Sequence, residues 1–228
     1  MPHAGGSASF YFPISQSLAP QCEVLAIQYP GRQDRRAEKN IESAVELADS
    51  VFQRICEWTD RPTYLFGHSL GAIVAYEVAR KLEAENIPVK ALFVSGRRAP
   101  SRHRTETVHT YNDEELIREV KRLSSIDSQI LANDEVLQMT LPAIRSDYKA
   151  AETYRELVPM QPLKVDIYAH IGVNDPKVAR DEAEDWAKHT SGSFTLSTYP
   201  GGHFYLISQS MSLIEVIRTV IMRHSLSG

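Results

Sequence analysis

Residues 63–79 read TYLFGHSLGAIVAYEVA, and this stretch decides the fold of the chain. A short apolar run at 63–66 leads into GHSLG at 67–71, and an apolar, helix-like stretch follows at once. A Gly-x-Ser-x-Gly turn between a strand and a helix is so sharp that only glycine fits on both sides of the serine. The turn holds the Ser69 hydroxyl in the open at a helix N-terminus, where the helix dipole favours a developing negative charge. This context predicts a nucleophilic serine, with an ordinary turn serine as the alternative.

The composition sets the class of protein. The 228 residues suffice for one α/β domain with a full core and leave little room for a second. A net charge of −4 argues against a nucleic-acid binder, and Cys22 and Cys56 form no CxxC pair, so neither a metal site nor a disulfide framework is expected. Because no apolar run approaches the ~20 residues that span a bilayer and no signal peptide is visible, we expect a cytoplasmic protein that binds no membrane.

Predicted strands and helices alternate along the chain. We expect a mostly parallel central sheet flanked by helices, in a single α/β domain over residues 1–228. The predicted strands are 24–29, 63–66, 91–94, 164–169 and 194–199, and the predicted helices are 41–58, 72–85, 176–189 and 206–224.

One long segment breaks this alternation. Residues 95–163 have no strand character and are predicted to form helices at 113–123 and 134–157, the second interrupted by Pro142. Because a connection of this length inside a compact domain is usually functional, we expect a helical lid, inserted at about 97–162, over the C-terminal edge of the sheet. The alternative is a packing layer with no role at the site.

A serine nucleophile needs a base, and the base needs a carboxylate to orient it. In α/β-hydrolases the acid and then the histidine follow the serine, in loops after later strands. His203 lies in GGHF at 201–204, where two glycines let the backbone bend so that the imidazole reaches across the sheet. His170, at the end of a strand, is the alternative.

Asp175 is the expected carboxylate. It lies in GVNDP at 172–176, after the penultimate strand, which is where the acid of such a triad belongs. The alternative for this residue is a helix N-cap. Asp166 lies inside a strand and fits less well.

The oxyanion of the transition state needs backbone N–H donors. One is expected from Leu70, the residue after the nucleophile, and the second normally comes from a glycine-rich loop after an earlier strand. The segment PHAGG at 2–6 has that character. Ala4 is the expected donor and Gly5 the alternative, although a flexible N-terminal tail would have a similar composition.

Arginines gather in two loops that leave the same edge of the sheet as Ser69. Such clusters suit a phosphate or an acidic partner, and we assign this binding role to Arg32, Arg97 and Arg98. Two solvated loops are the alternative. The arginines are at 32, 35 and 36 in one loop and at 97, 98, 102 and 104 in the other.

Taken together, these segments resemble the type II thioesterases of polyketide and non-ribosomal peptide (antibiotic) biosynthesis, over essentially the whole length. The resemblance rests on PHAGGSA at 2–8, YPGR at 29–32, GHSLGA at 67–72, the Asp175 loop and GGHF at 201–204. It implies an α/β-hydrolase core with a mobile lid. It also implies hydrolysis of acyl groups from the phosphopantetheine arm of an acyl or peptidyl carrier protein, which edits stalled or aberrant intermediates.

The mechanism that this resemblance implies uses the residues already named. Ser69 attacks the thioester carbonyl, His203 takes its proton and Asp175 holds the imidazole, so that no cofactor and no metal are needed. A carrier domain is typically acidic in such systems, which gives the arginines a partner.

One departure from the family pattern concerns the N-terminus. In this fold the glycine-rich loop follows a central strand, whereas only Met1 precedes Pro2 here. Losing an interior strand leaves its neighbours unpaired. We therefore expect that natural N-terminal residues are missing from this sequence. The alternative is a rearranged sheet that closes without that strand.

Three other functions use similar residues. A chain-terminating fatty-acyl thioesterase differs mainly in acyl length, and a carboxylesterase or lipase-like hydrolase acts on oxygen esters with the same triad. A non-catalytic hydrolase-like binding module is the third, and the complete set of Ser69, Asp175 and His203 argues against it.

Overall fold

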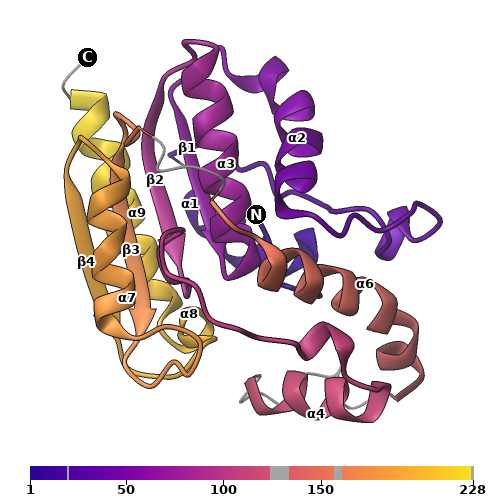
Figure 1. Cartoon of the computed structure of the whole chain (residues 1–228). Helices are drawn as coiled ribbons and strands as arrows, with labels where there is room; N and C mark the ends of the chain where they lie inside the picture. Colours follow the sequence, from indigo (N-terminus) through magenta and orange to yellow (C-terminus); the bar gives the residue numbers. More distant parts are fainter. Residues whose placement is uncertain (20, 124–133, 157–160, 227–228) are drawn as a thin grey trace.

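Four parallel strands form the sheet in the computed structural model, which describes residues 1–19, 21–123, 134–156 and 161–226 (Figure 1). The strand order is β1-β2-β3-β4, and Phe93 of β2 pairs with Phe66 on one side and Tyr168 on the other. The predicted α/β fold with a parallel sheet is therefore confirmed. The strands are β1 Thr63–His68, β2 Val89–Ser95, β3 Asp166–Gly172 and β4 Phe194–Tyr199.

Helices cover both faces of this sheet. Leu92 and Val94 share a core with α2 and α3, whereas Ala91 and Phe93 share a core with α1 and α9. Because alternate side chains of β2 point to opposite faces and both faces are covered, the centre of this strand, residues 91–94, is apolar without interruption. The covering helices are α1 Phe12–Leu18, α2 Ala44–Ile55, α3 Leu70–Ala84 and α9 Ser210–Leu226.

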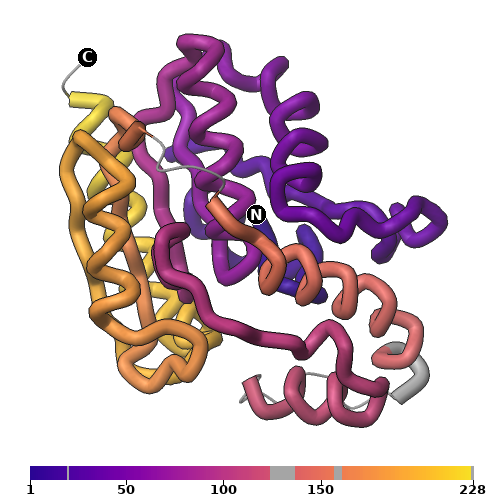
Figure 2. Tube along the Cα trace, viewed as in Figure 1, coloured from indigo at the N-terminus to yellow at the C-terminus, as the bar shows by residue number. Residues whose placement is uncertain are grey.

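The segment predicted to be a lid lies beyond the carboxyl ends of the strands. Its helices are α4 (Asp113–Leu123) and α6 (Asp134–Thr153), and both figures place them across that end of the sheet (Figure 1, Figure 2). The expected interruption at Pro142 is wrong, because α6 continues through this residue. Buried neighbours such as Leu141 and Ile144 hold the helix in place despite the missing N–H donor. The last residue of the predicted helix, Leu157, lies outside the described residues.

Shorter helices complete the described elements. Among the described residues, none of the helices combines the length and the apolar character needed to span a bilayer. The short elements are α7 Arg180–Glu184, α8 Tyr205–Ser208 and the 3-10 turns Ala8–Tyr11, Gln33–Arg35, Cys56–Trp58, Val108–Thr110 and Asp185–His189.

Residues 24–29 form no strand, so the strand predicted there is wrong. A strand needs a hydrogen-bonded neighbour, and among the described residues this segment pairs with no other strand. Residues 24–27 line a cavity of about 640 Å³ together with residues of β1. Beside the same strand, the α-amino group of Met1 donates to the carbonyl of Phe66 at 2.7 Å, and the carbonyl of Met1 accepts from His68 at 3.3 Å. The loop at 2–6 therefore starts directly beside β1.

Candidate active site

The turn at Ser69 has the geometry that its glycines predict. Ser69 adopts φ 56° and ψ −115°, a strained backbone for a residue with a side chain. A Cβ on Gly67 would lie 1.9 Å from the carbonyl oxygen of Gly71, and a Cβ on Gly71 would lie 2.1 Å from that of Met1. Glycine is thus required on both sides for steric reasons. Ser69 occupies the N-cap position of α3, and its side chain makes no capping hydrogen bond there.

The loops after β3 and β4 bring His203 and Asp175 together. The N–H of Asn174 donates to the carbonyl of Gly201 at 3.0 Å and ties the two loops to each other. Nδ1 of His203 lies 2.9 Å and 3.0 Å from the two carboxylate oxygens of Asp175. Both side chains are buried, with exposed fractions of 4% and 0%. The carboxylate therefore fixes the ring and leaves Nε2 for another partner.

The other candidates lie in different surroundings. His170 is buried with Nδ1 3.0 Å from the hydroxyl of Tyr199, and burial lowers its pKa to about 3. Asp166 accepts the N–H of Ser193 at 2.7 Å, at the opposite end of β3. Asp175 also accepts the N–H of Lys177 at 2.8 Å, so the local turn role and the contact with His203 exist together.

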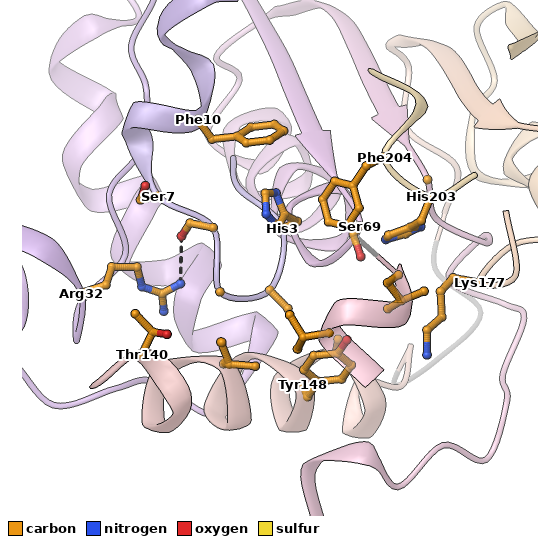
Figure 3. Close-up of a pocket in the computed structure, with 18 of the residues that line it drawn as sticks. His3, Ser7, Phe10, Arg32, Ser69, Thr140, Tyr148, Lys177, His203 and Phe204 are labelled. Carbon is orange, nitrogen blue, oxygen red and sulfur yellow. Dashed lines mark hydrogen bonds between the residues drawn. The ribbon is translucent and has the colours of Figure 1, made fainter. Parts of the chain in front are cut away.

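Ser69 and His203 line one cavity of about 440 Å³ (Figure 3). Figure 3 places Phe204 and Tyr148 around the same space, and Ala4 also lines it. Much of its wall is apolar and comes from α4 and α6. The apolar residues of these two helices that line the cavity are Val120, Leu123, Leu137, Ile144 and Ala151.

The glycine-rich loop forms a tight turn beside Ser69. The N–H of Gly6 donates to the carbonyl of His3 at 2.9 Å, and Gly5 has φ 73°. The N–H of Gly5 donates to Asp147 at 2.8 Å, so this alternative oxyanion donor is already occupied. Ala4, in the middle of the turn, lines the same cavity as Ser69, and its N–H stays the predicted oxyanion donor. Leu70 begins α3 immediately after Ser69.

Two further histidines surround His203, and the sequence reasoning did not single them out. The ring of His68 lies 4.9 Å from that of His203, and its Nδ1 lies 2.9 Å from Oγ of Ser95. Burial and the charge of His203 lower the pKa of His3 to about 3 and lower the pKa of His68 well below its usual value. Both rings are therefore neutral near pH 7. Their positions inside the two motifs, GHSLG and PHAGG, were the available signal.

Two of the three arginines assigned to partner binding are buried inside the chain. Arg32 is buried against Asp147, and Arg98 is buried against Glu106. Arg97 donates to the carbonyl of Ala151 at 2.9 Å, and burial lowers its pKa to about 9. The expectation of a docking surface is therefore wrong for Arg32 and Arg98, because carboxylates distant in the sequence bury and occupy their side chains. Arg97 is partly exposed and lines the cavity of Ser69, so its assignment stays a prediction.

The other arginines of the second loop are also paired with carboxylates. Arg102 pairs with Asp185, and Arg104 pairs with Glu182, so the local excess of positive charge is neutralised inside the chain. Within the described residues, no cluster of His, Cys, Asp and Glu side chains is arranged to hold a metal ion.

Comparison with known proteins identifies the family. The model of the thioesterase domain matches residues 1–221. Thioesterase PikA5 of Streptomyces venezuelae is 49% identical over 92% of this chain and 75% of its own length. A probable cadicidin biosynthesis thioesterase of Streptomyces griseus is 45% identical over 90% of this chain, which spans 56% of that relative.

A solved structure gives the same result for the fold. The type II thioesterase BorB from the borrelidin biosynthetic cluster superposes with a TM-score of 0.92 at 49% identity, over 96% of this chain and 90% of BorB. The chain therefore belongs to the thioesterase family: it is a thioester hydrolase of the serine-hydrolase type with the α/β-hydrolase fold, in the type II class of polyketide and non-ribosomal peptide biosynthesis.

Proposed function

We propose that this chain hydrolyses acyl thioesters on the phosphopantetheine arm of an acyl or peptidyl carrier protein, with Ser69, His203 and Asp175 as its catalytic residues. The observation that carries the proposal is the buried contact between His203 and Asp175 on the cavity that Ser69 also lines. A serine and a carboxylate-oriented histidine on one cavity are the groups that activate a hydroxyl.

The first half of the reaction transfers the acyl group to the enzyme. Oγ of Ser69 attacks the thioester carbonyl while Nε2 of His203 takes the hydroxyl proton. The tetrahedral intermediate then expels the pantetheine sulfur, which leaves as the thiol with the proton from His203. Asp175 stabilises the imidazolium that forms between these two steps.

The second half returns the enzyme to its starting state. Water attacks the acyl group on Ser69, His203 takes a proton from this water, and the acid is released as Ser69 regains its proton. In both halves the N–H groups of Leu70 and Ala4 receive the oxyanion, a contribution worth about 10²–10³-fold in rate for one donor. The nucleophile, the base, the carboxylate and both oxyanion donors in this mechanism are groups of the chain itself.

The apolar wall supplied by α4 and α6 suits the acyl chain of the substrate. Editing of stalled or aberrant intermediates fits this enzyme, since type II thioesterases such as BorB belong to biosynthetic clusters. Because Arg32 and Arg98 are buried against internal carboxylates, we assign carrier recognition to neither of these two arginines.

The experiment that tests this function compares three substrates with the same acyl group. Propionyl carrier protein, propionyl coenzyme A and 4-nitrophenyl propionate are assayed with the wild-type protein. We expect the highest kcat/KM for the carrier-bound thioester. A higher value for the oxygen ester would favour a carboxylesterase, and equal values for the carrier protein and coenzyme A would exclude recognition of the carrier.

A further inference from the structure

A buried ion pair connects the glycine-rich loop to α6. Nη1 and Nη2 of Arg32 donate to the two carboxylate oxygens of Asp147 at 2.6 Å and 2.9 Å. The exposed fractions of the two side chains are 5% and 0%. Arg32 comes from the loop after residues 24–29, whereas Asp147 lies on α6. Two charges buried this deeply are costly unless each has hydrogen-bond partners, so the use of their remaining hydrogen-bonding capacity is informative.

The pair uses that capacity on the backbone of the loop. The same Oδ2 of Asp147 accepts the N–H of Gly5 at 2.8 Å. Nη1 of Arg32 donates to the carbonyl of Gly6 at 3.2 Å, the contact drawn as a dashed line from Arg32 in Figure 3. The carbonyl of His3 accepts the N–H of Gly6 at 2.9 Å. The peptide groups on both sides of Ala4 are thereby held. Since the peptide plane between His3 and Ala4 is rigid, fixing its carbonyl also fixes the N–H of Ala4.

We infer that Asp147, held in place by Arg32, is a positioning residue that sets the oxyanion-binding N–H of Ala4 through the backbone of Gly5 and Gly6. The inference rests on the proposed function, in which this N–H receives the oxyanion. Oxyanion donors act only when they are aimed in advance at the place where charge develops. A loop rich in glycine has no such rigidity of its own, because its backbone is unusually free.

The position of Asp147 on α6 adds a consequence for the substrate. Ile144, one turn earlier, lines the cavity and packs so closely on the loop that a Cβ on Gly5 would lie 2.7 Å from its side chain. The helix that forms part of the acyl wall therefore also carries the anchor of the oxyanion loop. A displacement of α6 would move both together.

The test separates positioning from stability. In the double variant Arg32→Met/Asp147→Leu, an apolar pair of similar volume replaces the ion pair, a change that buried pairs often tolerate without loss of stability. Asp147→Asn is the conservative variant, because its amide oxygen still accepts the N–H of Gly5. Lys149→Met is the matched control, since it removes an exposed ion pair with Glu42 from the same helix. Circular dichroism and urea unfolding show whether each variant is folded.

The affinities for two inhibitors distinguish a positioning role from a merely structural one. A trifluoromethyl ketone analogue of propionyl pantetheine forms an oxyanion with Ser69, whereas the matching thioether has no carbonyl and reports binding alone. We expect the double variant to lose at least about tenfold in kcat and in affinity for the ketone, with unchanged affinity for the thioether. Asp147→Asn should show a smaller loss of the same kind, and Lys149→Met none.

If the double variant lost affinity equally for the ketone and the thioether, or kept its affinity for both, the inference would be overturned. If the double variant fails to fold, Asp147→Asn carries the same comparison, and an unchanged ratio of the two affinities there counts against the inference. Failure of the proposed function looks different, because a Ser69→Ala protein would then still hydrolyse the thioester.

Discussion

Nδ1 of His203 lies 2.9 Å from a carboxylate oxygen of Asp175, although the two residues come from loops after different strands. The pair is buried, and its carboxylate has a second partner in the N–H of Lys177. This geometry selects the ring tautomer that carries its proton on Nδ1 and leaves Nε2 as the basic nitrogen.

The first prediction concerns this tautomer. Asp175→Asn keeps the shape of the side chain, but its amide can donate to Nδ1 and favour the wrong tautomer, so kcat for a carrier-bound thioester should fall about 10³–10⁴-fold. The free energy of unfolding from urea titration should change far less. The exposed Asp181→Asn on α7 is the control and should keep wild-type kcat. A loss of less than about tenfold in Asp175→Asn would contradict the assignment.

The second prediction concerns the steric need for glycine around Ser69. Gly67→Ala would place a Cβ 1.9 Å from a backbone oxygen, and this overlap should destabilise the protein by about 3 kcal/mol or more. Gly202→Ala is the matched control, because the nearest atom would be 3.7 Å away, and it should cost less than about 1 kcal/mol. Urea unfolding measures both. Similar losses in the two variants would show that close packing at the elbow is not the cause.

The third prediction concerns pH. Burial lowers the pKa of His170 to about 3, against about 6.5 in an unfolded chain. Below pH 6.5 the unfolded state therefore binds a proton that the folded state does not, and the free energy of unfolding decreases as the pH falls. Each buried histidine of this kind makes the free energy of unfolding fall by about 1.4 kcal/mol for each pH unit between roughly pH 6 and pH 4.

His170→Asn should remove one of these contributions. Urea unfolding at a series of pH values measures the slope, which should be smaller in the variant than in the wild type by about one proton. His3 and His68 keep their own contributions, because burial lowers their pKa values in the same direction. An unchanged slope in the variant would contradict the burial argument for His170.

The fourth prediction concerns the acyl wall. Val120 of α4 lines the cavity, and Val120→Phe should narrow it. Because one or two methylenes in an apolar pocket are worth about 1–3 kcal/mol, kcat/KM for an octanoyl thioester should fall at least about tenfold more than kcat/KM for an acetyl thioester. Met139→Phe on α6, where the side chain is 73% exposed, is the control and should change neither. Equal losses on both substrates in Val120→Phe would place the acyl chain elsewhere.

Local sequence patterns were sufficient for much of the fold. The strand 194–199 and the helix 113–123 agree with β4 and α4 residue for residue, since each has its own periodicity and clear breaks at both ends. The strand predicted at 24–29 failed because a strand depends on a neighbour, and no local pattern states whether that neighbour is present. The predicted interruption of the helix at Pro142 is wrong for a related reason, because tertiary packing keeps α6 continuous.

The residues of the candidate site could be predicted where they lie in sequence motifs. Ser69, Asp175 and His203 were found from their loops, and the structure brings them to one region. Pairing between distant charges was not predictable, which is why Arg32 was assigned to a partner and Asp147 was missed. One signal was available: Asp147 lies three residues after Ile144, on the apolar face of its helix, where a carboxylate needs a buried partner.

The most direct measurement of the central claim follows the acyl group itself. Wild-type protein and Ser69→Ala are incubated with a propionyl carrier protein, and intact-mass analysis follows loss of the acyl group from the carrier and its appearance on the enzyme. We expect Ser69→Ala to lose at least about 10³-fold in the hydrolysis rate and never to carry the acyl group, whereas His203→Ala, if it reacts at all, should accumulate the acyl group on Ser69. Hydrolysis by Ser69→Ala at the wild-type rate would show that Ser69 is not the nucleophile.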